Sequence, residues 1–172
     1  MPPRLDQPIE KRTFAVLVDN EPGVLARVVG LFSARGYNIE SLTVAETDVA
    51  RHVSRITIVT SGTAIILEQI RAQLERMVSV REGHDVPSEP GGVERELALV
   101  KVRGTGAERV EALRVADIFR ARVIDTTHES FVFEVTGASS KIDKFVGLMR
   151  PLGLVELSRT GVLSITRGVE EM

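Results

Sequence analysis

Two prolines and two glycines lie within the short segment Pro87–Gly92, which divides the chain near its middle. Prolines and glycines this close together mark a linker between domains. On each side of it, strand-length apolar runs and amphipathic stretches follow the order β-α-β-β-α-β, the split pattern of ferredoxin-like folds. The sequence therefore predicts an α+β protein of two tandem ferredoxin-like units. The predicted bounds are a loose leader (1–11), a first domain (12–86), the linker (87–92), a second domain (93–168) and a tail (169–172).

Hydrophobic periodicity predicts the elements of the first domain. Apolar runs predict strands at 13–18, 37–46, 55–60 and 78–86. The first helix has a predicted buried stripe of Leu25, Val28, Val29 and Phe32, and Gly36 ends it. A second helix follows a turn and cap at Ser61–Thr63, and its stripe is Leu67, Ile70, Leu74 and Met77.

The same reasoning predicts the second domain, with strands at 94–102, 122–127, 131–136, 154–158 and 162–166. One helix spans 108–119, with a stripe of Ala112, Val115, Ala116 and Phe119. Ser140–Asp143 resembles a capping box and opens a helix with a stripe of Ile142, Phe145, Val146 and Met149. We expect the last two strands to close the sheet around a turn at Gly161.

Composition excludes several functional classes. Hydrophobic residues make up 43% of the 172 residues, which is enough for a core, and the formal net charge is -2. This charge argues against a nucleic-acid partner. The absence of cysteine excludes disulfides and thiolate sites, and it fits a cytoplasmic protein. No apolar run reaches the roughly 18 residues that a membrane span needs, so no membrane association is expected.

The sequence shows no catalytic or metal-binding constellation. His52, His84 and His128 are far apart and lack clustered carboxylates. Gly104–Gly106 lies between a predicted strand and helix, but Arg109 occupies the third glycine position of a dinucleotide-binding loop. We therefore expect no catalytic residue, metal or cofactor in this chain.

The segment Asp19–Val28 joins the first strand to the first helix and favours binding of a small carboxylate. Pro22 suits a first helical turn, and Gly23 lets another molecule approach the backbone. The first amides of a helix lack internal acceptors and lie at the positive end of the helix dipole. We expect Gly23 and Val24 to offer such amides. Asn20 can orient an amino acid, or it can simply cap the helix.

Small two-layer units leave one sheet face and the sheet edges exposed. Each predicted domain has only about 75–80 residues, a size at which association with a partner is a common source of stability. A homodimer is therefore expected.

Several runs of residues carry a resemblance to a known family. In the first half they are 20–28, 31–33, 35–44 and 54–59; in the second half they are 93–97, 99–102, 118–120 and 159–162. The run Gly36-Tyr37-Asn38-Ile39-Glu40-Ser41-Leu42 is the most specific of them. Together they resemble the regulatory (small) subunit of acetolactate synthase, also called acetohydroxyacid synthase.

The resemblance implies an N-terminal ACT domain, the amino-acid-sensing form of this fold, followed by a C-terminal ferredoxin-like domain. It also implies feedback inhibition by valine, bound where two ACT domains meet. It implies activation of a separate catalytic (large) subunit that carries thiamine diphosphate, Mg²⁺ and FAD. That holoenzyme converts pyruvate to 2-acetolactate in branched-chain amino acid biosynthesis.

By the same resemblance, Asn20, Gly23, Asn38 and Ile39 match positions that line the valine site, with Asn38 contributed by the partner chain. Val24 would add an amide, and Leu25 and Ile39 would face the isopropyl group. Three alternatives remain open: a free-standing amino-acid sensor without an enzyme partner, an enzyme, and an RNA-binding module. The preferred effector among valine, leucine and isoleucine also remains open, as does the surface that meets the catalytic subunit.

Overall fold

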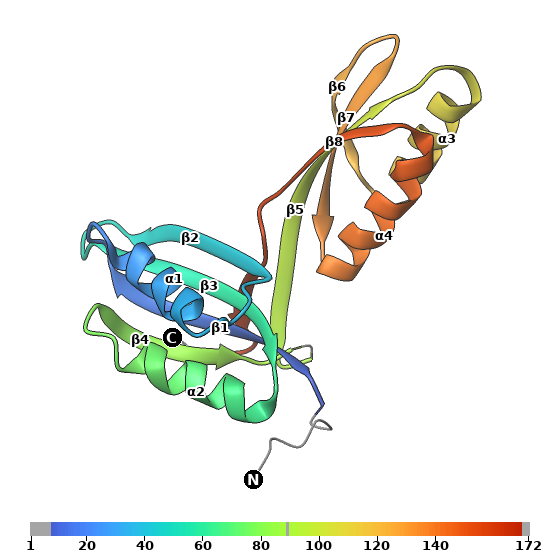
Figure 1. The fold of residues 1–172 in the computed structure, drawn as a ribbon. Helices are drawn as coiled ribbons and strands as arrows, with labels where there is room; N and C mark the ends of the chain where they lie inside the picture. Colours follow the sequence, from blue (N-terminus) through green and yellow to red (C-terminus); the bar gives the residue numbers. More distant parts are fainter. Residues whose placement is uncertain (1–7, 89, 170–172) are drawn as a thin grey trace. The chain divides into compact units, whose positions relative to one another are not determined.

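The structure, a computed structural model, describes residues 8–88 and 90–169. The chain divides into two compact units, one of Met1–Val93 with Val162–Met172 and one of Glu94–Gly161 (Figure 1). Within the described residues, no helix combines the length and the apolar character that crossing a membrane requires. Most of the predicted leader (1–7), Glu89 of the predicted linker and 170–172 of the predicted tail lie outside the described residues.

The first unit has the predicted β-α-β-β-α-β order. Its elements are β1 (Glu10–Asp19), α1 (Val24–Ala34), β2 (Ser41–Asp48), β3 (Val53–Gly62), α2 (Ala64–Glu75) and β4 (Val80–Val86). The strands form an antiparallel sheet in the order β2-β3-β1-β4. Both helices pack on the same face of this sheet (Figure 1).

Successive side chains of a strand point to opposite faces of the sheet, and this alternation decides which residues contact the helices. Phe14 and Val16 of β1 lie opposite Ile58 and Ile56 of β3, and all four point toward the helices. The helices contribute Val24, Val28 and Phe32 from α1 and Leu67, Ile70 and Leu74 from α2. The predicted stripe of α1 is therefore confirmed at Val28 and Phe32 only, because Leu25 is 41% exposed, Val29 is only half-buried, and Val24 is buried instead.

Helix α1 ends where the sequence predicts, at Gly36. Gly36 has φ 67°, and its amide donates to the carbonyl of Ser33, while the amide of Tyr37 donates to the carbonyl of Phe32. These two bonds form a Schellman motif, which needs a left-handed residue such as glycine. The Tyr37 ring packs edge-on against Phe32 at 6.3 Å between centroids, which fixes the direction in which the chain leaves the helix.

The second unit repeats the predicted order up to its last strand. Its elements are β5 (Gly92–Arg103), α3 (Gly106–Ile118), β6 (Arg122–Thr126), β7 (Ser130–Gly137), α4 (Ser139–Met149), a short 3-10 turn (Arg150–Leu152) and β8 (Leu154–Arg159). These strands have the order β6-β7-β5-β8 in a five-stranded sheet, whose fifth strand pairs with β5. One cluster of buried residues joins Val100, Phe133 and Phe145 with the predicted stripes of both helices.

The predicted capping box at Ser140–Asp143 is wrong. Helix α4 begins at Ser139, with Ala138 at the capping position and no side-chain cap. The amides of Lys141 and Ile142 donate instead to the carbonyl of Ala138. Ser140 therefore lies inside the first turn, where its hydroxyl has no role as a cap.

The most consequential difference concerns the last strand. We expected 162–166 to pair with 154–158 in the second domain, but β9 (Leu163–Thr166) pairs with β5 and belongs to the first unit. Its anchors are hydrogen bonds between the Val162 amide and Ser41, between Thr43 and the Val162 carbonyl, and between Arg55 and the Ser164 carbonyl. Val162 and Ser164 are buried, while the more apolar Leu163 and Ile165 are exposed.

Three predicted boundaries also differ from the structure. Strand β1 begins at Glu10, so the predicted leader overlaps it by two residues, Glu10 and Lys11. Strand β2 begins at Ser41, because Tyr37–Ile39 form the irregular exit from α1. Gly92 of the predicted linker is the first residue of β5.

Candidate functional site at the two ends of helix α1

The connection from β1 to α1 is held by backbone hydrogen bonds. The Asn20 amide donates to the carbonyl of His52 at 2.7 Å, and the Glu21 amide donates to the carbonyl of Asp19 at 2.9 Å. Gly23 then takes the capping position of α1 with φ 87°. A left-handed backbone at this point favours glycine. A Cβ built on Gly23 would meet no atom within 4 Å, so the space above it is open.

The free amides at the start of α1 differ from those predicted. The Val24 amide is already used, because it donates to the carbonyl of Glu21 at 3.3 Å. The first bond of the helix runs from Arg27 to the carbonyl of Gly23. The amides of Leu25 and Ala26 lie between these two and have no acceptor within residues 8–88 and 90–169. Leu25 and Ala26 therefore replace Val24 as candidate amide donors, beside Gly23, whose amide also donates to no carbonyl of the described residues.

The side chains around this turn leave it open to a ligand. Asn20 is exposed, and no side chain caps α1, so the reading of Asn20 as a simple helix cap is wrong. The first turn of α1 contains no acidic residue, and the positive end of its dipole is therefore not neutralised there. Glu21, the nearest preceding carboxylate in the chain, is exposed, and Asp19 is bound to Arg81 at 2.5 Å. A small anion would meet two amides and an exposed carboxamide here.

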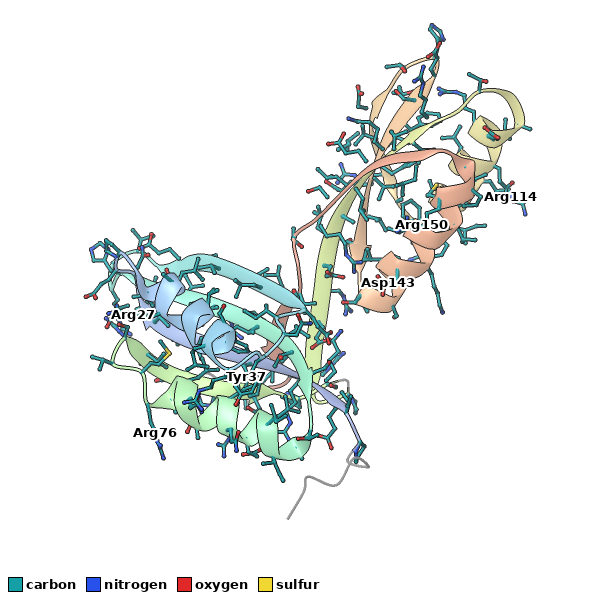
Figure 2. All side chains as sticks on the ribbon, in the orientation of Figure 1. Arg27, Tyr37, Arg76, Arg114, Asp143 and Arg150 are labelled. Carbon is teal, nitrogen blue, oxygen red and sulfur yellow. The ribbon has the colours of Figure 1, made fainter. Side chains whose placement is uncertain are left out.

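The other predicted ligand residues lie at the opposite end of α1. Asn38 is exposed, and its carbonyl accepts a hydrogen bond from Thr60 at 2.5 Å. Ile39 is half-buried and packs against the core. Arg27, near the start of α1, and Tyr37, just beyond its end, mark the two ends in Figure 2.

One chain cannot bring these two groups to the same small ligand. Helix α1 has 11 residues, which corresponds to a length of roughly 16 Å at about 1.5 Å per residue. The pair Asn20 and Leu25 is thus separated by the whole helix from the pair Asn38 and Ile39. A single amino acid could contact both pairs only if the second came from another copy of the chain.

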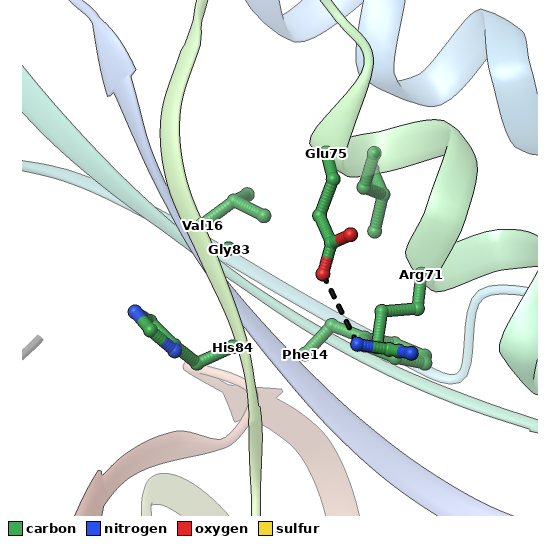
Figure 3. A pocket seen from close by; sticks show the side chains of 7 residues that line it. Phe14, Val16, Arg71, Glu75, Gly83 and His84 are labelled. Carbon is green, nitrogen blue, oxygen red and sulfur yellow. Dashed lines mark hydrogen bonds and ion pairs between the residues drawn. The ribbon is translucent and has the colours of Figure 1, made fainter.

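Within residues 8–88 and 90–169, no group of three or more histidine and acidic side chains could hold a metal ion. A small pocket between α2 and β4 is shown in Figure 3, and the two charged side chains on its helical side, Arg71 and Glu75, pair at 3.3 Å. His84 lies across β4 from them (Figure 3), so this pocket gathers no acid–base pair.

Comparison with known proteins assigns the family. The model for the AHAS small subunit-like ACT domain matches residues 14–82, and the model for the small subunit of acetolactate synthase matches residues 95–168. The chain is 45% identical over 159 residues to the acetolactate synthase small subunit of Haemophilus influenzae, covering 92% of this chain and 96% of that one. It is 44% identical over 159 residues to the acetolactate synthase isozyme 3 small subunit of Escherichia coli, with the same coverage.

The chain belongs to the acetolactate synthase small-subunit family. A crystal structure of the acetolactate synthase small subunit from Thermotoga maritima has a TM-score of 0.84 to this structure at 36% identity, covering 92% of this chain and 98% of that one. The resemblance read from the sequence is therefore confirmed, and the first unit contains the ACT domain of this family. Both ends of α1 lie within the matched residues 14–82.

For this member of the acetolactate synthase small-subunit family, the sequence analysis missed Ala26 as an amide donor. The signal was available, because all of the first amides of a helix lack acceptors within the helix. What the sequence alone could not show was that Gly23 is the capping residue, which sets the numbering of that first turn.

Proposed function

We propose that this chain is the regulatory subunit of an acetolactate synthase and senses valine between two of its ACT domains. The observation that carries the proposal is the pair of amides at Leu25 and Ala26, which follow a left-handed Gly23 and have no acceptor in the described part of the chain. The valine carboxylate would accept from these amides. Asn20 and, from a second copy, Asn38 would orient the amino acid. Leu25 and Ile39 would contact the isopropyl group.

The sheet of the first unit supports a homodimer. Strand β2 lies at an edge of the sheet, where one side of its backbone has no strand partner among the described residues. Val44 on β2 and Leu25 on α1 are 45% and 41% exposed, respectively. In a two-fold dimer, each contact occurs twice. The start of α1 in each copy would then meet the end of α1 in the other, and this arrangement yields two equivalent valine sites.

The chemistry would belong to the partner enzyme. A separate catalytic subunit, with thiamine diphosphate, Mg²⁺ and FAD, would convert pyruvate to 2-acetolactate in the cytoplasm, and this chain would raise its activity. Valine would favour a dimer arrangement that lowers that activity. Allosteric coupling is typically about 1–3 kcal/mol, or a factor of roughly 5–150. By reciprocity, a catalytic-subunit state that valine disfavours would weaken valine binding by the same factor.

Calorimetric titration with valine tests the site. Asn20→Ala and Asn38→Ala should each weaken valine binding by about 10-fold or more, because each removes a hydrogen bond to a charged group. Gln73→Ala, which removes a carboxamide from α2, should bind valine like the unaltered protein. Parallel titrations with leucine and isoleucine identify the preferred effector. Wild-type valine affinity in both asparagine variants would remove the basis of the site assignment.

A complementation experiment tests the shared site directly. After equimolar Asn20→Ala and Asn38→Ala proteins exchange chains, each mixed dimer has one site with both asparagines and one with neither. About a quarter of all sites should therefore bind valine with normal affinity, although each variant alone binds it weakly at every site. A site built within one chain would show no such recovery.

Association with the catalytic subunit separates this proposal from a free-standing sensor. A regulatory subunit should raise the turnover of a thiamine-dependent acetolactate synthase, and valine should lower it again. Valine binding without any effect on that turnover would favour the free-standing sensor. Acetolactate formation by the purified chain alone would show that it is an enzyme in its own right.

A further inference from the structure

The face of the first sheet that points away from α1 and α2 carries an arginine without a counterion. Arg55 of β3 lies beside Ala45 of β2 and Leu17 of β1, and it alternates with Ile56, which faces the helices. Its Nη2 donates to the carbonyl of Ser164 on β9 at 2.7 Å. Its other guanidinium nitrogens have no acceptor in the part of the chain that the structure describes, and no described carboxylate pairs with it.

The surroundings of Arg55 differ from those of the other partly buried arginines that form ion pairs. Arg12 lies within 3.6 Å of Glu10, Glu68 and Asp85, and Arg159 contacts Glu96 and Asp143. Arg55 is half-buried, and that burial lowers its pKa with no neighbouring charge to offset it. A guanidinium nevertheless stays charged at neutral pH. A buried cation is costly without an anion nearby, so the position favours an anionic ligand.

A pocket of about 230 Å³ opens beside this guanidinium. Its lining residues come from three strands: Thr43, Ala45, Thr47, Arg55, Thr57, Leu163, Ser164 and Ile165. Ser164 is only 3% exposed, and its hydroxyl is buried without a hydrogen-bond partner among the described residues. The pocket thus combines a free cation, an unused hydroxyl donor and the apolar side chains of Ala45, Leu163 and Ile165.

We propose that this pocket binds the carboxylate of a small aliphatic acid, in a second ligand site apart from the one at α1. A guanidinium fork can hold a carboxylate by two parallel hydrogen bonds, and Ser164 Oγ can donate a third. The apolar walls would contact the hydrocarbon part of the acid. The pocket is smaller than the about 300–1,000 Å³ of sites for drug-sized molecules, so the acid must be small.

The same groups select against an amino acid. Arg55 is the charged residue of the lining, and the lining holds no carboxylate that could pair with an α-ammonium group. An ammonium beside a guanidinium would be repelled, because like charges disfavour each other at short range. An acid that lacks the amino group should therefore bind here better than valine does. The two sites also lie on opposite faces of the sheet, since α1 packs on the other face.

The experiment uses the full-length protein and isobutyrate at low ionic strength, followed by backbone amide NMR and calorimetry. Isobutyramide, a neutral molecule of the same shape, and inorganic phosphate are the comparison ligands. Isobutyrate should bind saturably, with amide shifts confined to β2, β3 and β9, and isobutyramide should not bind. Equal shifts from isobutyrate and isobutyramide, or tighter binding of phosphate than of isobutyrate, would overturn the proposal.

Two variants separate ligand contact from the anchoring of β9. Ser164→Ala removes only a hydroxyl without a partner, so the fold should persist while isobutyrate affinity falls about 10-fold. Arg55→Lys keeps the charge but loses the fork, and it should weaken isobutyrate binding by more than 10-fold. Arg76→Gln is the matched control, because Arg76 is exposed at the end of α2 (Figure 2). It should bind isobutyrate normally.

The outcome is independent of the valine proposal. Asn20→Ala should retain full isobutyrate affinity, and Ser164→Ala should retain full valine affinity. If Ser164→Ala and Arg55→Lys both bind isobutyrate like the unaltered protein, the pocket is not its site. If the amide signals around Arg55 shift when the catalytic subunit is added but not when isobutyrate is added, the anion comes from a protein side chain. The small-molecule proposal is then wrong.

Discussion

Alanine substitution at two glycines of the same segment should change stability in opposite directions. Gly23 caps α1 with φ 87°, and Gly30 lies in the interior of the same helix. A Cβ at either position would meet no atom within 4 Å, so steric contacts do not distinguish the two substitutions. The backbone conformation does. The pair therefore tests the conformation that leaves the Leu25 and Ala26 amides free.

The magnitudes follow from the two conformations. A left-handed backbone costs an alanine roughly 1–2 kcal/mol, so Gly23→Ala should destabilise the protein by about that amount. In a helix interior, alanine is favoured over glycine by about 0.8–1.0 kcal/mol, so Gly30→Ala should be stabilising by up to about 1 kcal/mol. The two variants should differ by about 2–3 kcal/mol. Asparagine tolerates the left-handed region better, and Gly23→Asn should recover part of the loss.

Urea unfolding at matched protein concentration measures the difference. The midpoint should fall for Gly23→Ala and rise for Gly30→Ala, with little change in the slope m. Gly23→Ala should also weaken valine binding, because its methyl group occupies the open space before the free amides. Equal midpoints for the two variants, or a higher midpoint for Gly23→Ala, would show that Gly23 does not have a left-handed backbone and would refute the reasoning.

Three further predictions concern stability. Gly153→Ala should destabilise the second unit by more than about 3 kcal/mol in thermal melting, because φ is +97° and a Cβ would lie 2.0 Å from the Arg103 carbonyl oxygen; a normal melting temperature would contradict this. Arg159→Met should cost about 3–5 kcal/mol in urea unfolding, because it leaves the carboxylate of Glu96, 5% exposed, without its ion-pair partner. Replacing Glu96 by Gln in the same chain should recover much of that loss. The pKa of Glu40 is lowered from its usual 4.5, first by the hydrogen bond from Ser61 and then by Lys11. A carboxyl with a lowered folded-state pKa stabilises the fold above its unfolded value and loses that contribution as pH falls through the folded pKa. Glu40→Gln should therefore melt with a weaker pH dependence below pH 4.5, and an unchanged profile would argue against this ion pair.

Much of the candidate site could be read from local sequence. Pro22 and Gly23 indicated an open helix start, and Gly36 indicated the exit that leads to Asn38 and Ile39. Each of these depends on backbone preferences within a few residues, which the sequence carries directly. The identity of the free amides could not be read with equal accuracy, because it depends on which residue caps the helix: the Val24 amide is bound to Glu21, and the Leu25 and Ala26 amides are free.

The sequence by itself determined the order of strands and helices, most of the buried stripes and the family, because periodicity and short motifs act over a few residues. Only the tertiary structure decided that β9 belongs to the first unit, that it covers part of the open sheet face beside Arg55, and that Ser164 is buried there. The alternating pattern of 162–166 predicts a strand but not its partner. The strand pairs with β5, and its position on the first unit rests on hydrogen bonds to Ser41, Thr43 and Arg55, more than 100 residues away in the chain; such long-range contacts leave no local trace.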